Sequence, residues 1–231
     1  MVTLSANQLL EPANAAFQHW WQCNGEWVEP LNQRREGESG VQLLESQDPL
    51  QPTLYSKRQT GHLYRSVRHP LGRPTIVREL YAYQAFERLG VPVPKLVFGS
   101  ARKQAGQWQA LLVTQALTGF ISLEQWYQEP HSTEHTQCML AALGETLARM
   151  HRGRWQHGCC YAKHLFVRIQ EDEGRSPRAD TALLDLEKSR RRWRTADASR
   201  HDMRQLKRHC GAMPEKDWQR LMQTYTAALA I

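Results

Sequence analysis

The chain has 231 residues, of which 41% are hydrophobic and 23% charged, which is enough to bury a core in one large domain or two small lobes. Lysine and arginine (30) exceed aspartate and glutamate (23), and the net charge is +7. A basic surface suits anionic partners such as nucleotide phosphates, nucleic acid or anionic lipid, although part of the charge serves solubility alone. No apolar run reaches about 18 residues, so the sequence predicts no transmembrane helix.

The N-terminal segment Met1–Asn7 lacks a basic stretch followed by an apolar one, and we therefore expect no secretory signal. The cysteines are odd in number and unevenly placed, which favours a reducing compartment over a disulfide framework. They are Cys23, Cys138, Cys159, Cys160 and Cys210.

The first part of the chain predicts strands and turns, beginning with the tryptophan-rich segment 17–28. Gly37 and Gly40 lie in a polar turn. This pattern fits a plain hairpin, and it also fits a loop whose backbone N–H groups approach phosphates closely. Residues 53–59 predict a short strand that contains Lys57. A lysine in a strand needs a partner before it indicates more than a solvated charge.

A helix is predicted over 76–89, after a turn at 70–75 in which Thr75 is a plausible N-cap. Glu79 lies near the start of this helix. It is either the partner of Lys57 or a charge that favours the helix N-terminus. Gly90 and the following prolines end the helix.

The remaining elements are predicted by their apolar spacing. They are strands at 95–98 and 108–115, a hinge at 116–120, helices at 122–127 and 136–150, strands at 165–169 and 181–184, and helices from 201 onward. This order predicts an α+β fold of two lobes, with an antiparallel-sheet N-lobe over 1–115 and a mainly helical C-lobe over 116–231.

Two segments carry the chemical signal. His157-Gly-Cys-Cys-Tyr-Ala-Lys-His164 and the Asp185 that follows an apolar run are similar to the two acidic loops of protein kinases. There, a loop of the form H-R-D-x-x-x-x-N holds the base and a metal ligand, and a later aspartate holds the metal. Cys159 stands in place of the first aspartate.

Lys57, Glu79, His157, His164 and Asp185 follow the kinase order. Several sequence fragments resemble one family with this order, the lipopolysaccharide kinase family of the InaA or Kdo-kinase-like type. They are Lys57-Arg-Gln, Pro74-Thr-Ile-Val-Arg-Glu79, Gly90-Val-Pro-Val-Pro94, Met150-His-Arg, His157 to His164 and Leu184-Asp-Leu-Glu-Lys188. The resemblance covers roughly 30–210. It implies a protein-kinase-like fold and a cytoplasmic, Mg-ATP-dependent kinase of a lipopolysaccharide core sugar.

The resemblance also implies roles for individual residues. Lys57 would contact ATP phosphates and pair with Glu79, and Asp185 would hold Mg²⁺. Three further roles are implied: Gly37 and Gly40 in the loop over the phosphates, Gln115 to Leu117 at the adenine, and His164 at the second metal contact. Imidazole is a softer ligand than magnesium prefers.

Cys159 leaves two functions open. A general base typically raises the reaction rate by about 100- to 10,000-fold. Its loss would therefore slow phosphoryl transfer without necessarily abolishing it. His157 is either a substitute base or a structural support. The alternative function is a pseudokinase that binds nucleotide or a partner without efficient transfer.

The basic run Lys188 to Arg194 follows Asp185, where kinases keep a segment that meets the substrate. Its arginines are candidates to hold a phosphorylated glycan or the anionic inner membrane surface, against the simpler reading of a solvated charge run. They are Arg190, Arg191, Arg192 and Arg194. Asp202 is expected to anchor the catalytic loop from a helix.

The sequence offers weaker signals for two other kinds of function, a metal or redox site and nucleic-acid binding. His157, Cys159, Cys160 and His164 offer a metal or redox site, but adjacent cysteines point apart and there is no C-x-x-C pair. Charge alone permits nucleic-acid binding, but no motif supports it. We therefore expect ATP and Mg²⁺ as cofactors, an anionic glycan as partner and no nucleic acid.

Overall fold

The structure is a computed structural model that describes residues 14–34, 37–46, 48, 50–67 and 69–231. Met1–Asn7, the segment expected to carry no secretory signal, lies outside the described residues. The chain divides into two compact units. The first takes the described part of Met1–Tyr81 with Pro94–Ala116, and the second takes Ala82–Val93 with Leu117–Ile231. The chain thus leaves the first unit next to the expected hinge, but 82–93, expected in the first lobe, groups with the second unit.

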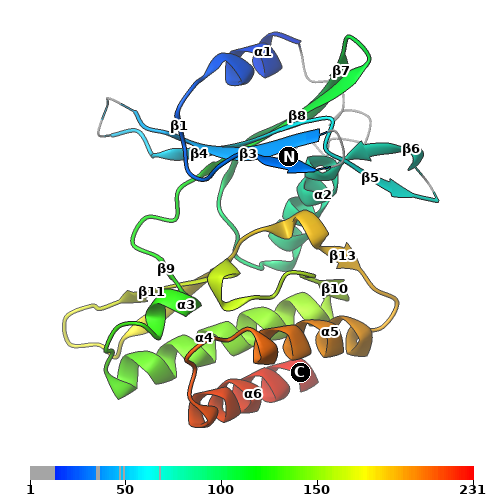
Figure 1. Ribbon diagram of the computed structural model, residues 1–231. Helices are drawn as coiled ribbons and strands as arrows, with labels where there is room; N and C mark the ends of the chain where they lie inside the picture. The colour runs from blue at the N-terminus through cyan, green and yellow to red at the C-terminus, as the bar shows by residue number, and fades with distance from the viewer. Residues whose placement is uncertain (1–13, 35–36, 47, 49, 68) are drawn as a thin grey trace. The chain divides into compact units, whose positions relative to one another are not determined.

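The first unit is built on an antiparallel sheet of six strands (Figure 1). The strands are β1 (Glu26–Trp27), β2 (Asn32–Arg34), β3 (Gly37–Leu44), β4 (Leu54–Thr60), β7 (Leu96–Gln104) and β8 (Gln107–Gln115). Their order is β1-β3-β4-β8-β7, with β2 also paired to β3. β4 and β8 are central, and the pairing sets Lys57 opposite Val41 on one side and Leu112 on the other. The predicted strands at 53–59 and 108–115 are confirmed within a residue or two.

The prediction of strands and turns was wrong for the first described segment, which is helix α1 (Asn14–Gln22). Phe17, Trp20 and Trp21 are spaced three and four apart, so they share one face of a helix. Phe17 is fully buried, and the rings of Phe17 and Trp20 lie 6.4 and 6.2 Å from that of Phe98 on β7. Aromatic residues favour strands in general, but here they bury a helix face.

Helix α2 (Thr75–Leu89) begins where predicted, and strand β4 holds its first turn. The Ile76 N–H donates to Gln59 Oε1 at 3.1 Å, and the Gln59 amide donates to Thr75 Oγ1 at 2.7 Å. Because side chains alternate along a strand, Gln59 and Lys57 share one face of β4. The same strand face therefore fixes the start of the helix and presents Lys57 to it.

Between β4 and α2 the structure has a hairpin of β5 (Leu63–Ser66) and β6 (His69–Pro74). The sequence predicted only a turn at 70–75, because Pro70 and Pro74 cannot donate to a ladder. These prolines are tolerated because β6 lies at the edge of a two-stranded sheet.

The second unit is mainly helical. Its helices are α3 (Leu123–Trp126), α4 (Thr133–Arg152), α5 (Thr195–Arg208) and α6 (Glu215–Ala230), with short 3₁₀ turns η1 (Ala162–His164) and η2 (Leu186–Lys188). Its strands are β9 (Ile121–Ser122), β10 (Trp155–Gln156), β11 (Leu165–Gln170), β12 (Arg178–Leu183) and β13 (Arg190–Arg191). Among the described residues, no helix is both long and apolar enough to cross a bilayer. The architecture is α+β, as predicted.

Helix α4 forms the core of this unit and packs against α6 and α5 (Figure 1). The predicted apolar stripe is confirmed, because its members are at most 1% exposed; they are Met139, Leu140, Leu143, Leu147 and Met150. Gly144 permits the close approach of α6, since a Cβ there would lie 3.0 Å from the Tyr225 nitrogen. The end of α4 thereby becomes a rigid base for the loop that follows β10.

Candidate active site

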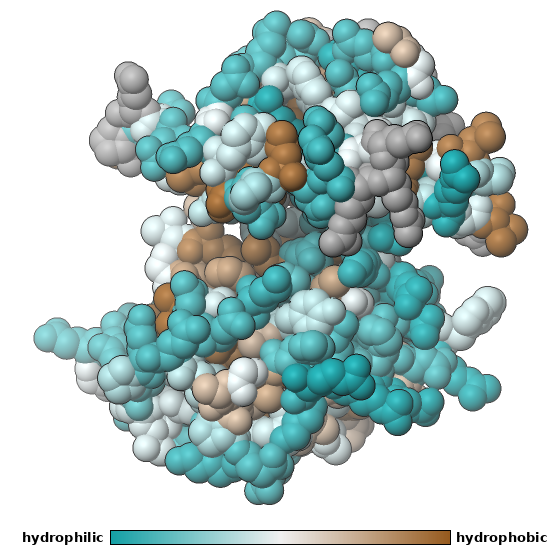
Figure 2. Space-filling model, in the orientation of Figure 1, coloured by the Kyte–Doolittle hydropathy of each residue, from teal (hydrophilic) through white to brown (hydrophobic). Residues whose placement is uncertain are grey.

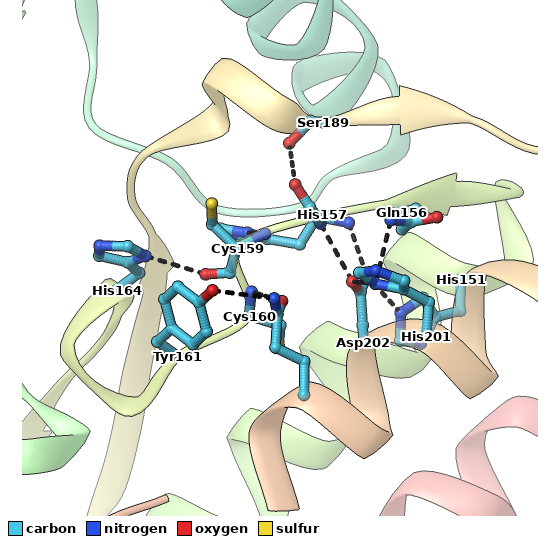
Figure 3. Close-up of polar contacts among 12 residues, drawn as sticks. His151, Gln156, His157, Cys159, Cys160, Tyr161, His164, Ser189, His201 and Asp202 are labelled. Carbon is cyan, nitrogen blue, oxygen red and sulfur yellow. Dashed lines mark hydrogen bonds and ion pairs between the residues drawn. The ribbon is translucent and has the colours of Figure 1, made fainter. Parts of the chain in front are cut away.

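The loop from His157 to His164 is held by a carboxylate from helix α5 (Figure 3). Asp202 is fully buried, and its two oxygens accept the backbone N–H groups of His157 at 2.5 Å and Gly158 at 3.0 Å. A carboxylate that accepts backbone N–H groups makes strong, charge-assisted hydrogen bonds. The expectation that Asp202 anchors this loop from a helix is confirmed.

Asp202 stays ionised because it is surrounded by donors. Burial would by itself raise the pKa of this carboxyl, but hydrogen bonds from His151 and the two loop amides outweigh burial and hold the pKa below its ordinary value. His151 Nε2 lies 3.2 Å from Asp202 Oδ2, and His201 Nδ1 lies 3.1 Å from Oδ1. The loop is therefore fixed to a buried negative charge whose two oxygens have hydrogen-bond partners in the protein.

The anchoring network continues into helix α6. The other ring nitrogen of His151, Nδ1, lies 2.8 Å from the Tyr225 hydroxyl, which donates to Ser199 Oγ at 2.6 Å. Burial raises the pKa of Tyr225 to about 12, so the hydroxyl keeps its proton at neutral pH. Helices α4, α5 and α6 thus meet at one polar chain that ends on Asp202.

One turn further along α5, Gln205 holds the middle of the loop. Its Oε1 accepts the Cys160 N–H at 2.7 Å, and its Nε2 donates to the Tyr161 hydroxyl at 3.1 Å. Residues three apart lie on the same side of a helix, so Asp202 and Gln205 fasten consecutive parts of the loop. Helix α5 therefore fixes the loop backbone at His157, Gly158 and Cys160.

His157 has the geometry of a support. Its side chain is fully buried, and Nδ1 accepts the Cys159 N–H at 3.2 Å. Burial lowers the pKa of His157 to about 4, although Asp202 and Asp185 act in the opposite direction. A neutral imidazole whose Nδ1 lone pair is already occupied braces the loop, and this favours the supporting role over the substitute base.

The Cys159 thiol is a poor base. Burial, together with the charges of Asp185 and Glu187, raises its pKa to about 11, with Lys188 acting in the opposite direction. About one thiol in ten thousand is ionised at pH 7 with such a pKa. Figure 3 shows the sulfur pointing away from the Asp202 side chain. Cys159 therefore carries no negative charge at neutral pH.

His164 and Asp185 face each other. The His164 Nδ1–H donates to the Cys159 carbonyl at 2.9 Å, so in the neutral ring the lone pair is on Nε2. Nε2 lies 3.7 Å from Asp185 Oδ2. Asp185 is in the left-handed region at φ 59° and ψ 64°, which costs a non-glycine residue about 1 kcal/mol or more. Strain of this kind is concentrated at functional sites.

In the first unit, Lys57 and Glu79 form an ion pair. Lys57 Nζ lies 2.9 Å from Glu79 Oε2, with the side chains 17% and 3% exposed. Removing one member of a buried pair costs about 3–5 kcal/mol, so this pair holds the Lys57 ammonium firmly. The structure brings together the two residues that the sequence paired.

A model of the Lipopolysaccharide kinase (Kdo/WaaP) family matches residues 18–225. Protein InaA of Escherichia coli (strain K12) is 46% identical over 215 residues, which cover 91% of this chain and 95% of InaA. The chain belongs to the lipopolysaccharide kinase (Kdo/WaaP) family. The solved structure of WaaP in complex with acyl carrier protein shares the fold, with a TM-score of 0.68 and 20% identity, covering 95% of this chain and 88% of that one.

Gly37 and Gly40, predicted to approach phosphates, lie where close packing leaves no room for a larger side chain. A Cβ on Gly37 would lie 2.5 Å from the Gly61 carbonyl carbon, and one on Gly40 would lie 2.7 Å from the side chains of Leu31 and Trp27. Both are buried. Residues 35–36 of the predicted turn lie outside the described residues. Phosphate binding by this loop stays a prediction.

Gln115 and Leu117, the residues predicted at the adenine in this kinase family, fall on either side of the point where the chain changes units. The Gln115 N–H donates to the Lys95 carbonyl at 2.9 Å, and the Ala116 N–H donates to the Thr53 carbonyl at 2.8 Å. The backbone N–H groups of Gln115 and Ala116 are therefore already occupied, and adenine binding by this segment stays a prediction.

The arginines of the basic run differ in their exposure to solvent. Arg190, Arg191 and Arg194 are exposed, whereas Arg192 is half-buried and its N–H donates to the Arg154 carbonyl at 2.7 Å. β13 pairs with β10 directly before the loop, with Arg190 opposite Gln156. Trp193 is 92% exposed. The run is therefore fixed by its backbone next to the start of the 157–164 loop.

Sequence reasoning assigned no role to His151, Tyr225, Ser199 or Gln205. One signal was available, because Ala198, Asp202 and Leu206 are spaced by four and all buried, which puts a carboxylate in an apolar helix stripe. The metal or redox site built from His157, Cys159, Cys160 and His164 is not supported. Within the described parts of the chain, no three His, Cys, Asp or Glu residues are arranged to hold a metal.

Proposed function

We propose that this chain is an ATP-dependent phosphotransferase that phosphorylates a sugar hydroxyl of the lipopolysaccharide core or a related anionic glycan. The observation that carries the proposal is the approach of His164 Nε2 to Asp185 Oδ2, at 3.7 Å, in a chain of the lipopolysaccharide kinase family. An imidazole nitrogen and a carboxylate oxygen are both ligands that divalent cations accept. This arrangement suits a metal bound together with nucleotide.

Asp185 and His164 would hold the divalent ion. Mg²⁺ usually takes one or two protein ligands and completes its shell with water and substrate phosphates, so two side chains are sufficient. The ion supplies neutralisation of the charge on the phosphates. Lys57, held by Glu79 at 2.9 Å, is suited to contact nucleotide phosphates as a fixed positive charge.

The rest of the loop would position the acceptor. Phosphoryl transfer depends mostly on alignment and charge neutralisation, and a backbone fixed by Asp202 and Gln205 meets the first requirement. The exposed arginines of the basic run would contact anionic groups of the acceptor or the membrane that carries it. We propose a cytoplasmic protein that is at most peripheral at the inner membrane.

The first test is nucleotide binding. Mg-ATP should raise the melting temperature of the wild-type chain, because a ligand that binds only the folded state stabilises it. ATP with a chelator, or Mg-ATP with Asp185→Asn, should give a much smaller shift. Transfer of labelled phosphate to core oligosaccharide, compared with Asp185→Ala, tests the chemistry. No shift with Mg-ATP and no transfer above the mutant would reject the proposal.

A second test concerns the basic run. Reversing the charge at Arg191 and Arg194 should weaken binding to anionic lipopolysaccharide by at least about tenfold, since each arginine near an anionic surface contributes about 1 kcal/mol. Arg88→Glu with Arg175→Glu is the matched control, because both residues are exposed and belong to the same unit. Equal binding by the two double mutants would show that only net charge matters.

The second candidate function is the pseudokinase. It is favoured by one observation, the buried Cys159 with its pKa raised to about 11 at the position of the kinase aspartate. In that case the shift with Mg-ATP would persist, while transfer would not exceed that of Asp185→Ala.

A further inference from the structure

The β5–β6 hairpin presents two large apolar side chains to solvent. Val67, in the turn that connects the strands, is 101% exposed, and Leu71 on β6 is 89% exposed. Figure 2 shows hydrophobic surface, in brown, over this hairpin at the right-hand edge of the view. Within the described residues, the hairpin forms a sheet of its own and its strands pair with no other strand.

Single exposed apolar residues are ordinary on a protein surface, but this placement is unusual for two reasons. Tight turns favour Gly, Asn, Asp, Pro and Ser, each for a backbone reason, and a β-branched valine offers none of these advantages. A short two-stranded ribbon also gains stability from burying its apolar side chains, and here two of them face water. The hairpin is therefore arranged for contact with something apolar.

The same segment carries only positive charge. Residues 49–78 contain six lysines and arginines and no aspartate or glutamate. Arg65 on β5 is exposed. Arg73 on β6 lies 3.2 Å from His69 Nε2. An apolar tip is thus flanked by cations.

The base of the hairpin is held in place. The guanidinium of Arg78 on helix α2 lies over the Tyr64 ring at 4.8 Å, and the Thr75 N–H donates to the His62 carbonyl at 3.2 Å. Burial raises the pKa of Tyr64, as expected for a ring packed at the base. The tip therefore projects from a fixed support instead of collapsing onto the sheet.

We propose that the tip of the β5–β6 hairpin docks on an anionic phospholipid bilayer. Val67 and Leu71 enter the boundary between headgroups and acyl chains, while Arg65 and Arg73 contact headgroup phosphates. A stable protein partner needs about 800 Å² on each side, far more than two side chains offer. Nucleic acid would use the arginines but leave the apolar tip in water.

Co-sedimentation with vesicles tests the proposal without nucleotide, so its outcome is separate from that of the proposed kinase activity. Wild-type chain should bind vesicles of phosphatidylglycerol and phosphatidylethanolamine and bind phosphatidylcholine vesicles much more weakly. Val67→Ser with Leu71→Ser should weaken binding by about tenfold to a hundredfold, from the apolar area withdrawn. Arg65→Ala should weaken it by about fivefold.

Leu50→Ser is the matched control, because Leu50 is 92% exposed in the same unit but outside the hairpin. It should bind as wild type. An environment-sensitive dye on Val67→Cys, with Cys23 and Cys138 replaced by serine, should shift to shorter wavelength on vesicles, and the same dye on Leu50→Cys should not. If wild-type chain does not bind, if only the arginine change weakens binding, or if the dye at position 67 does not shift, the proposal is overturned.

Discussion

Replacing Cys159 with aspartate is expected to raise the rate of phosphoryl transfer by about 100- to 10,000-fold, the usual contribution of a general base. The reason is that the present thiol, with a pKa raised to about 11, carries no charge at neutral pH and accepts a proton poorly. An aspartate would be ionised there if Lys188, which already interacts with the thiol, remains its partner. Labelled phosphate transfer to core oligosaccharide, at saturating Mg-ATP, measures the effect.

Cys159→Ser is the matched control, since a hydroxyl is similar in size but is no base at neutral pH. It should stay within a few-fold of wild type. The melting temperature of each variant must be recorded, because a new carboxylate beside Asp185 and Glu187 carries an electrostatic cost. A large gain for Cys159→Asp alone would identify the native site as catalytically impaired. A loss of rate at unchanged stability would mean that the thiol is suited to this site.

Asp202→Ala is expected to lower the free energy of unfolding by about 3–5 kcal/mol, the cost of breaking a buried charged network. The change leaves the amides of His157 and Gly158 without their acceptor and leaves His151 beside an empty space. Urea unfolding followed by circular dichroism measures the loss. Asp197→Ala in the first turn of the same helix is the control, and should cost only about 0.3–1 kcal/mol.

Because Asp202 is ionised in the folded chain, we expect the stability of the chain to depend on pH in the acid range. Because the pKa of Asp202 is lower in the folded chain than in the unfolded chain, its contribution to stability is fully present above the unfolded value, about 3.9, and is lost as pH falls through the folded value. Asp202→Asn should remove this part of the dependence. The stability difference between wild type and Asp202→Asn should therefore shrink on acidification below about pH 4. A difference that is constant with pH would argue against an ionised Asp202.

The elements that the sequence predicted well depend on local pattern alone. The stripe Met139 to Met150 repeats every three to four residues, and α4 buries all of it. Helix α1 carries the same spacing in Phe17, Trp20 and Trp21, but over two turns the pattern competes with the strand preference of aromatic residues. β6 was missed because its prolines indicate a turn, and only its edge position makes them acceptable.

The candidate site also contains features that the sequence predicted and features that it did not. The order of Lys57, Glu79, His157, His164 and Asp185 was readable, because chemical type and spacing are properties of the chain itself. The pairing of Lys57 with Glu79 followed from that order and is present at 2.9 Å. The four residues that continue the anchoring network were not readable as such, because each acts through a partner at least 26 positions away.

What the sequence by itself determined is the set of reactive groups, among them the thiol at position 159, and the family. Only the tertiary structure decided the protonation of those groups. The pKa of Cys159 rises and that of His157 falls because both are withdrawn from water, and Asp202 stays charged because His151 on helix α4 and two amides of the loop donate to it. Burial and donor geometry arise when distant segments pack together, and no local pattern records them.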